Sequence, residues 1–141
     1  MPTRHASAVW EGDLKSGKGS MKLGSGAFNG AYSFGTRFES APGTNPEELI
    51  AATHAACFSM ALSAQLGAAN LTPESISTTA TLTLEKLDSG FAITTIHLDV
   101  VARVPKADAA AFNTAAQNAK AGCPVSKVLN AKITMDAKLE A

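Results

Sequence analysis

The chain has 141 residues, and its 12 Lys and Arg residues balance its 12 Asp and Glu residues. This length allows one domain with a hydrophobic core, so we expect a single domain over residues 1–141. A net charge of zero argues against nucleic-acid or anionic-membrane partners, because these require clustered basic residues. The first ten residues lack the apolar core of a secretory signal, so we expect a cytoplasmic protein, in which reducing conditions disfavour a permanent structural disulfide.

The first third of the sequence is predicted to hold strands. Residues 5–11 and 18–23 have the composition of two paired strands, and Gly12 and Gly17 allow the turn between them. Residues 32–38 are interpreted as a further short strand. This region is therefore predicted to form a small sheet.

The central helix is the longest predicted element. Asn45 can cap its start and Pro46 suits its first position, while two acidic residues follow in the first turn. We expect the helix to end near Leu66, where Gly67 offers a stop. The uncharged residues 49–71 are long enough to cross a bilayer, but polar side chains interrupt them and Ala dominates. A buried helix of a protein without membrane contact is therefore expected.

The second half of the chain shows strand patterns on both sides of a helical region. Residues 79–84 and 95–100 alternate apolar with polar side chains, which predicts a long antiparallel hairpin with one buried face. Asp108 can cap a helix that Gly122 ends, and a short helix can follow. Residues 132–140 alternate again as a last strand. Because strands and helices are segregated, the predicted class is α+β.

The two cysteines, Cys57 and Cys123, keep two interpretations open from the residues alone. Each can be a small buried hydrophobic residue, as free cysteines often are. Cys123, however, precedes Pro124 at a helix start, where unpaired amide groups favour a thiolate and lower the thiol pKa. Cysteines far apart in sequence can also meet in the fold as a redox pair.

Other candidate groups also have two interpretations. His54 lies three residues before Cys57 on a similar helical face, so a Cys–His nucleophile stays open, although a histidine bonded to backbone is favoured. His97 lies on a strand with no partner in view and is expected at the surface. Arg37 can stabilise a thiolate with Glu47 orienting it, or each can be an ordinary surface charge. No metal-ligand spacing accompanies the cysteines, so no metal is expected.

Five motifs resemble the OsmC/Ohr family, and more closely its OsmC branch. They are residues 10–13 (WEGD), 36–39 (TRFE), 43–50 (GTNPEELI), 54–60 (HAACFSM) and 121–126 (AGCPVS). The resemblance covers nearly the whole chain. It implies an intertwined α+β homodimer with antiparallel sheets packed around a long central helix. It also implies a peroxidase that reduces organic hydroperoxides, and hydrogen peroxide less well, without a metal or bound organic cofactor.

The resemblance also assigns roles to four residues. Cys57 resembles the peroxidatic cysteine, Cys123 the resolving cysteine, Arg37 the thiolate-stabilising arginine and Glu47 its orienting partner. Attack by Cys57 rests on this resemblance, since the helix-start argument makes Cys123 the more acidic thiol. The implied cycle forms a Cys57 sulfenic acid and then a Cys57–Cys123 disulfide. An external dithiol resets it, for which the resemblance suggests a lipoylated protein.

Helix geometry adds an expectation about assembly. Ten residues of straight helix place Glu47 and Cys57 about 15 Å apart along the axis. Either the chain bends between them, or Arg37 and Glu47 serve Cys57 of a second subunit, so we expect an obligate homodimer with active sites at the interface. An apolar substrate pocket is expected to involve some of these aromatic residues: Phe28, Phe34, Phe38 and Phe58.

Two other classes of function stay open. The first is a non-catalytic stress or ligand-binding protein whose cysteines are buried and inert. The second is a Cys–His hydrolase that uses His54. Oxidation of the thiols by an organic hydroperoxide separates the peroxidase from both.

Overall fold

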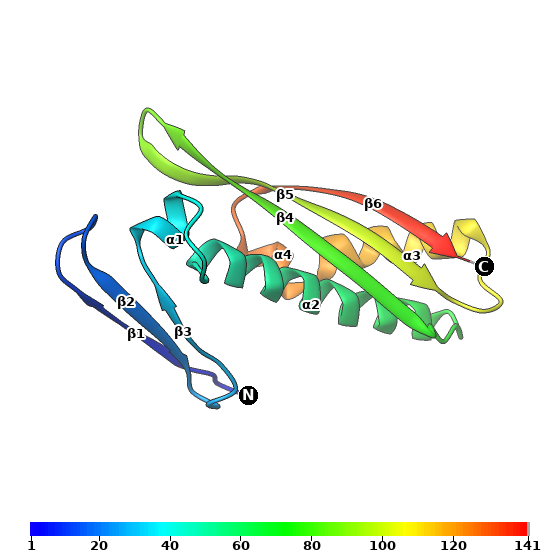
Figure 1. Cartoon of the computed structure of the whole chain (residues 1–141). Coiled ribbons are helices and arrows are strands. Elements are labelled where there is room, and N and C mark those ends of the chain that lie inside the picture. The colour runs from blue at the N-terminus through cyan, green and yellow to red at the C-terminus, as the bar shows by residue number, and fades with distance from the viewer. Residues whose placement is uncertain (141) are drawn as a thin grey trace. The chain divides into compact units, whose positions relative to one another are not determined.

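The computed structural model describes residues 1–140, and its contacts divide the chain into two compact units, Met1–Leu49 and a second one from Ile50 onward. The single domain expected from the length stays a prediction. The elements in chain order are β1 Ala6–Glu11, β2 Lys18–Leu23, β3 Asn29–Tyr32, α1 Phe34–Phe38, α2 Pro46–Ala68, β4 Ser75–Leu87, β5 Gly90–Arg103, α3 Ala109–Gly122, α4 Pro124–Val128 and β6 Lys132–Glu140 (Figure 1).

The first unit contains an antiparallel sheet in the order β1-β2-β3. Trp10, Gly19 and Tyr32 lie side by side across its three strands. The Trp10 and Tyr32 rings meet over Gly19 with their centroids 5.5 Å apart. A Cβ atom on Gly19 would lie 2.6 Å from the Tyr32 ring and 2.7 Å from the Trp10 ring. Glycine at this position therefore permits the aromatic contact.

The strand expected over residues 32–38 is wrong, because β3 ends at Tyr32 and the helix α1 follows. Ser33 and Thr36 form a capping box at the start of this helix. The Thr36 amide donates to Ser33 Oγ over 3.2 Å, and the Ser33 amide donates to Thr36 Oγ1 over 2.8 Å. These two side-chain bonds satisfy amide groups that a helix start otherwise leaves unpaired.

The start predicted for the central helix is confirmed, and its end lies slightly further along. The Glu48 amide donates to Asn45 Oδ1 over 2.7 Å, as expected of a cap. The helix α2 continues through Gly67 to Ala68. Asn70 then adopts a positive φ of 60°, and the Leu71 amide donates to the Leu66 carbonyl over 2.9 Å. Asn70 rather than glycine thus supplies the left-handed stop.

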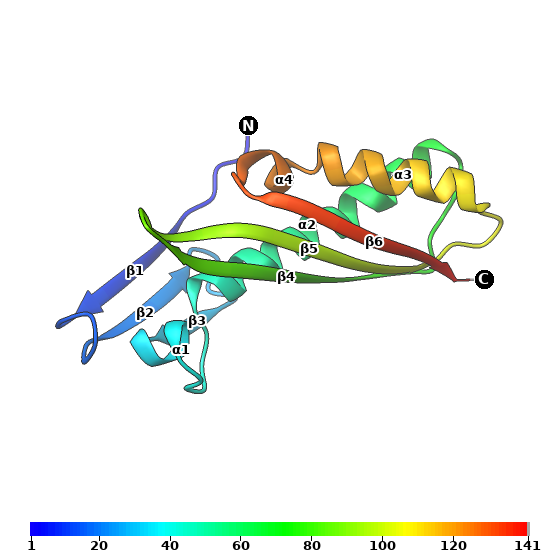
Figure 2. The same ribbon diagram turned by 90° about the horizontal axis from the view of Figure 1, so that it is seen from above.

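The second unit contains a sheet in the order β4-β5-β6, whose strands run side by side in Figure 2. The predicted hairpin is confirmed as the antiparallel pair of β4 and β5. Strand β6 runs parallel to β5, so this sheet is mixed rather than antiparallel throughout. The helices α3 and α4 supply the crossover that a parallel pair requires. The α+β class is confirmed.

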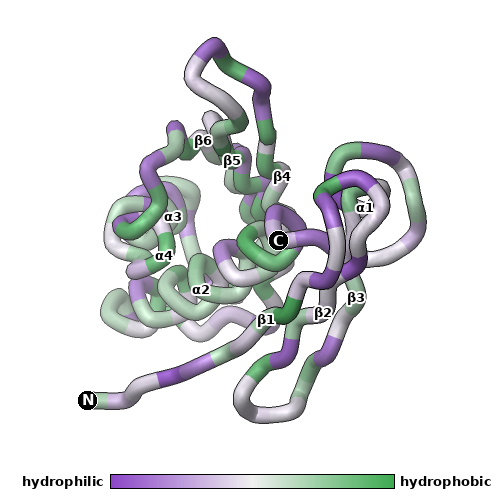
Figure 3. The backbone as a smooth tube through the Cα atoms, turned by 90° about the vertical axis from the view of Figure 1, so that its left-hand side faces the viewer, coloured by the Kyte–Doolittle hydropathy of each residue, from purple (hydrophilic) through white to green (hydrophobic). Residues whose placement is uncertain are grey.

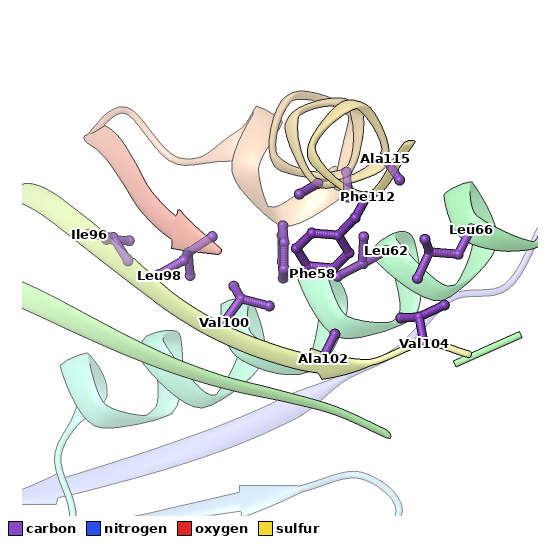
Figure 4. Close-up of a cluster of buried hydrophobic side chains, with 12 residues drawn as sticks. Phe58, Leu62, Leu66, Ile96, Leu98, Val100, Ala102, Val104, Phe112 and Ala115 are labelled. Carbon is purple, nitrogen blue, oxygen red and sulfur yellow. The ribbon is translucent and has the colours of Figure 1, made fainter. Parts of the chain in front are cut away.

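The hydrophobic core of the second unit lies between this sheet and the helices (Figure 4). Its members come from α2, from β5 and the residue that follows it, and from α3: Phe58, Leu62, Leu66, Ile96, Leu98, Val100, Ala102, Val104, Phe112, Ala115, Ala116 and Ala119. Burying each large apolar side chain contributes about 1.5–3 kcal/mol to stability. Phe58 is fully buried here, so its expected place in a substrate pocket is wrong. It instead anchors the turn of α2 that carries Cys57.

The helix α2 is long and apolar enough to cross a membrane by length and composition, with a mean hydropathy of 1.4. Figure 3 shows most of α2 on the hydrophobic side of the colour scale. Core helices of soluble proteins pass the same test, and Phe58 inserts into the core of the second unit. Only 22% of the most apolar stretch is buried, so α2 presents a large uncovered apolar surface.

Candidate active site

The two cysteines, Cys57 of α2 and Cys123 at the junction of α3 and α4, meet in the second unit. Their sulfur atoms lie 2.8 Å apart although 66 residues separate them in sequence. Both are free thiols, and a disulfide bond would bring the two atoms to about 2.05 Å. Oxidation therefore requires only a small movement of the two side chains. The structure thus brings the two cysteines together, as a redox pair requires.

Cys123 terminates one helix and begins the next. Its amide donates to the Ala119 carbonyl over 2.9 Å and so ends α3. It is also the N-cap of α4, with Pro124 at the first helical position, which confirms the predicted helix start. Cys123 therefore lies at the positive end of the α4 dipole, which favours a thiolate.

The surroundings shift the two thiols in opposite directions. Burial tends to raise the pKa of Cys123, but hydrogen bonds from Cys57, Ser126 and Val125 outweigh it, and the pKa of Cys123 is lowered. Burial raises the pKa of Cys57, the contact with Cys123 adds to this, and only the Val125 amide opposes it. These directions agree with the helix-start argument, which made Cys123 the more acidic thiol.

Access to solvent favours the other cysteine. Cys57 is half-buried, whereas Cys123 is 0% exposed. A peroxide arriving from solvent can therefore contact the Cys57 sulfur, while Cys123 is shielded. Cys123 is thus the more acidic thiol, whereas Cys57 is the more accessible one. An additional cation beside Cys57 would lower the Cys57 pKa and so make the accessible thiol reactive as well.

Arg37 and Glu47 form a paired site in the first unit. Arg37 Nε lies 2.8 Å from Glu47 Oε1, and Arg37 Nη2 lies 3.1 Å from Glu47 Oε2. Glu47 is nearly buried, and it lies in the first turn of α2, where the helix dipole favours a carboxylate. The bidentate pair fixes the plane of the guanidinium group. The structure therefore brings Arg37 and Glu47 together, and the role expected of the pair stays a prediction.

A cavity of about 230 Å³ lies beside Arg37 in the first unit. Apart from Ser33, its lining consists of aromatic and aliphatic side chains and one cation: Trp10, Leu14, Tyr32, Phe34, Phe38 and Arg37. Two of the four expected aromatic residues, Phe34 and Phe38, are among them, with ring centroids 5.0 Å apart. Phe28 is not part of this lining. The cavity can receive a small apolar molecule that carries a polar group.

His54 is fully buried in the second unit and bonds a side chain rather than the expected backbone group. Its Nε2 atom lies 2.7 Å from Ser126 Oγ, and its Nδ1 atom has no hydrogen-bond partner among residues 1–140. Burial lowers the pKa of His54, which keeps the ring neutral near pH 7. Ser126 was not singled out from the sequence. The sequence feature that could have indicated Ser126 is its spacing. Ser126 follows Cys123 by three residues, just as His54 precedes Cys57 by three.

His97 has partners that the sequence did not indicate. Its Nδ1 atom lies 2.6 Å from Thr134 Oγ1, and its Nε2 atom lies 3.0 Å from Asp136 Oδ2 and 3.3 Å from Asp99 Oδ1. The histidine and the two aspartates have the donor atoms of a metal site. Both aspartates are largely exposed, with 57% and 84% of their side chains accessible, and we assign no cation to this surface group.

Comparison with known proteins gives concordant matches in family and fold. The family model of OsmC-like proteins matches residues 38–138. Peroxiredoxin OsmC of Escherichia coli (strain K12) is 58% identical over 134 residues, which cover 94% of each chain. An OsmC-like protein of unknown function from Vibrio cholerae has a TM-score of 0.81 at 15% identity, with 97% of this chain and 99% of that chain covered. OhrB, an organic hydroperoxide resistance protein of Bacillus subtilis, has a TM-score of 0.72 at 24% identity over 95% and 98%.

Proposed function

The chain belongs to the family of OsmC-like proteins, and we propose on that premise that it is a cysteine-based peroxidase that reduces organic hydroperoxides to alcohols. Hydrogen peroxide is its less efficient substrate. The observation that carries this proposal is the 2.8 Å contact between the sulfur atoms of Cys57 and Cys123. The family match runs from residue 38 to residue 138 and so crosses the boundary between the two compact units, which supports a single OsmC-like domain over residues 1–141.

The reaction begins at the more accessible thiol. The Cys57 thiolate attacks the terminal oxygen of the hydroperoxide, the O–O bond breaks, and the alcohol leaves after taking up a proton. Cys57 then carries a sulfenic acid. The Cys123 sulfur attacks the Cys57 sulfur, a disulfide forms, and water leaves. The short distance between the sulfur atoms supports this second step.

Arg37 supplies the cation that Cys57 requires in this reaction. A guanidinium beside the Cys57 sulfur lowers the thiol pKa against the effect of burial and stabilises negative charge on the departing oxygen. Glu47 orients Arg37 through the bidentate ion pair. We therefore propose Cys57, Cys123, Arg37 and Glu47 as the catalytic set, with neither metal nor organic cofactor.

The functional unit is a homodimer with the active sites at its interface. Glu47 and Cys57 lie ten residues apart on α2, a rise of about 15 Å in a straight helix. Arg37 and Glu47 of one subunit therefore serve Cys57 of the other. The uncovered apolar surface of α2, on which Met60 is 76% exposed, supports burial against a second copy.

The cavity beside Arg37 supports the preference for organic hydroperoxides. Aromatic walls stabilise the apolar part of such a molecule, while Arg37 attracts its peroxide oxygens. Hydrogen peroxide has no apolar part and gains nothing from these walls. The substrate class thus follows from a lining that combines apolar side chains with one cation.

Completion of the cycle requires an external two-electron donor. A dithiol resets the Cys57–Cys123 disulfide by exchange, and a lipoylated protein is the proposed physiological source. Such exchange suits a reducing compartment, so we propose a cytoplasmic protein. Zero net charge supports the absence of nucleic-acid and membrane partners.

A single measurement separates the peroxidase from the alternatives. The reduced protein is treated with one equivalent of cumene hydroperoxide, and its free thiols and intact mass are measured. Loss of two thiols with a mass lower by about 2 Da, equal to two hydrogens, is expected. Unchanged thiols would indicate a ligand-binding protein whose cavity is its functional site. A Cys–His hydrolase is disfavoured because His54 bonds Ser126 instead of a cysteine.

A further inference from the structure

We propose that His54 and Ser126 form a proton relay that removes the thiol proton of Cys123 as the Cys57–Cys123 disulfide closes. The inference rests on the proposed peroxidase function and concerns only its second chemical step. In this relay Ser126 contacts the reacting sulfur, and His54 is a positioning residue that acts through Ser126. Neither residue belongs to the catalytic set proposed above.

The relay is visible as two parallel contacts between α2 and the start of α4. Cys57 meets Cys123 with their sulfur atoms 2.8 Å apart, and His54 Nε2 meets Ser126 Oγ over 2.7 Å. His54 lies about one turn before Cys57, and Ser126 lies about one turn after Cys123. Ser126 is also among the groups that lower the pKa of Cys123. The Cys123 sulfur, the Ser126 hydroxyl and the His54 ring therefore follow one another across the contact between α2 and the start of α4.

The burial of Cys123 explains why such a path is needed. Cys123 is 0% exposed, so a base in bulk solvent cannot contact its thiol. A thiol must lose its proton before its sulfur can attack a sulfenic acid, because the thiolate is the nucleophile. The hydroxyl of Ser126 and the ring behind it form a proton acceptor that reaches the buried sulfur.

The state of His54 fits an acceptor better than a packing residue. The ring is 0% exposed, yet its Nδ1 atom has no hydrogen-bond partner among the described residues. Leaving a buried polar atom unpaired destabilises a protein, and an apolar side chain at this position would avoid that cost. Burial also lowers the pKa of His54, so the ring is neutral before the step and readily releases a proton that it has accepted.

The step balances without any further reactant. The Cys123 thiol proton passes to Ser126 Oγ while the Ser126 hydroxyl proton passes to His54 Nε2, in the tautomer that carries a proton on Nδ1. The Cys123 sulfur attacks the Cys57 sulfur, the S–S bond forms and the S–O bond of the sulfenic acid breaks. The departing hydroxide takes up one proton and leaves as water, and His54 returns to its neutral state by releasing the relayed proton, so no proton is gained or lost overall. Cys123 is oxidised, and the sulfenic sulfur of Cys57 is reduced.

Rapid mixing of the reduced full-length protein with cumene hydroperoxide tests the relay, because its two steps are measured separately. Peroxide consumption reports the first step, and acid-quenched intact mass reports disulfide formation. In His54→Gln the amide retains a bond to Ser126 but cannot accept a proton. We expect the rate of peroxide consumption by this variant to stay within about twofold of the wild-type rate. Its rate of disulfide formation should fall about tenfold or more, which is the scale of general-base catalysis.

Matched variants distinguish proton transfer from packing. Ser126→Ala should slow disulfide formation as His54→Gln does, while Ser126→Thr retains the hydroxyl and should restore the wild-type rate. His97→Gln changes a histidine outside this cluster and should alter neither step. If His54→Gln does not fold, the comparison of Ser126→Ala with Ser126→Thr decides alone.

Failure of the proposed relay can be distinguished from failure of the proposed peroxidase function. Wild-type rates of disulfide formation in both His54→Gln and Ser126→Ala would overturn the relay and leave the peroxidase intact. Equal slowing of both steps would also overturn it, because that pattern indicates a general loss of packing. Absence of any disulfide in the wild-type protein would refute the peroxidase function instead.

Discussion

The guanidinium of Arg37 binds both carboxylate oxygens of Glu47, with Nε and Nη2 at 2.8 and 3.1 Å. Glu47→Gln removes the charge that holds this geometry, and one charge-assisted contact contributes about 1.5–3 kcal/mol. We expect kcat/KM for cumene hydroperoxide to fall about 10- to 100-fold. The matched control is Glu48→Gln, because Glu48 follows Glu47 in α2 and its carboxylate accepts a hydrogen bond from the Thr44 hydroxyl. Equal losses in both variants would contradict the role of Glu47.

Single replacement of each cysteine should separate the two steps of the cycle. Cys57→Ser should abolish turnover, because serine cannot form the sulfenic acid. Cys123→Ser should still reduce one equivalent of peroxide and then accumulate a sulfenic acid on Cys57, with recycling restored only by small thiols. Steady-state assays and trapping with dimedone measure these results. Retention of full turnover by Cys57→Ser would refute the assignment of attack to Cys57.

A mixed-dimer experiment tests whether the active site is shared between subunits. Cys57→Ser and Arg37→Ala are each expected to be nearly inactive as homodimers. When they are unfolded and refolded together, a mixed dimer contains one site with both Cys57 and Arg37 if these come from different subunits. We expect activity to recover toward about one quarter of wild type, since half of the dimers are mixed and each has one intact site. No recovery, or a fully active monomer on sedimentation, would exclude the shared site.

The aromatic cavity predicts a selective change in substrate preference. Phe34→Ala shortens one wall of the cavity and removes the contact with Phe38, whose ring centroid lies 5.0 Å away. We expect kcat/KM for cumene hydroperoxide to fall about tenfold, on the scale of a lost aromatic contact. The value for hydrogen peroxide should change less than about threefold. A parallel loss with both peroxides would show that Phe34 supports the fold rather than the substrate.

Acid should destabilise the reduced protein through His54. The folded-state pKa of His54 lies below the ordinary histidine pKa of about 6.5, so between the two values the unfolded chain binds more protons. The full stability of the neutral ring is therefore present above about pH 6.5 and is lost as the pH falls toward the folded pKa, by at most about 1.4 kcal/mol per pH unit. Urea unfolding at pH 7.5 and 5.5 measures this loss, which His54→Gln should abolish and His97→Gln should retain.

Local signals made much of the fold predictable. Asn45 and Asp108 cap helices through contacts with nearby amides, and the alternation over residues 132–140 indicates a strand with one buried face. Ser33 and Thr36 cap a helix of five residues, which is too short to show the helical periodicity that would distinguish it from a strand. The parallel pairing of β6 with β5 depends on the path of the crossover, which no local pattern encodes.

The candidate site depends more strongly on contacts that are distant in sequence. Pairing of Cys57 with Cys123 spans 66 residues and was expected only through resemblance to a family. The bond between His54 and Ser126 spans 72 residues, and neither side chain indicates the other. The direction of the Cys123 pKa shift was predictable, because the Ser126 and Val125 amides of the helix start help to lower it, although the largest lowering effect comes from the distant Cys57 thiol. Tertiary packing determines which side chain reaches that helix start.

The large sequence separation between the paired cysteines also affects the stability of the folded chain. A disulfide between Cys57 and Cys123 closes a ring that contains β4, β5 and α3. By the loop-entropy relation, a ring of this size stabilises the fold by about 4 kcal/mol. Each turnover therefore alternates the protein between an open chain and a covalent loop. The disulfide form is therefore more resistant to unfolding and proteolysis than the reduced form. Reduction of the disulfide removes this extra stability.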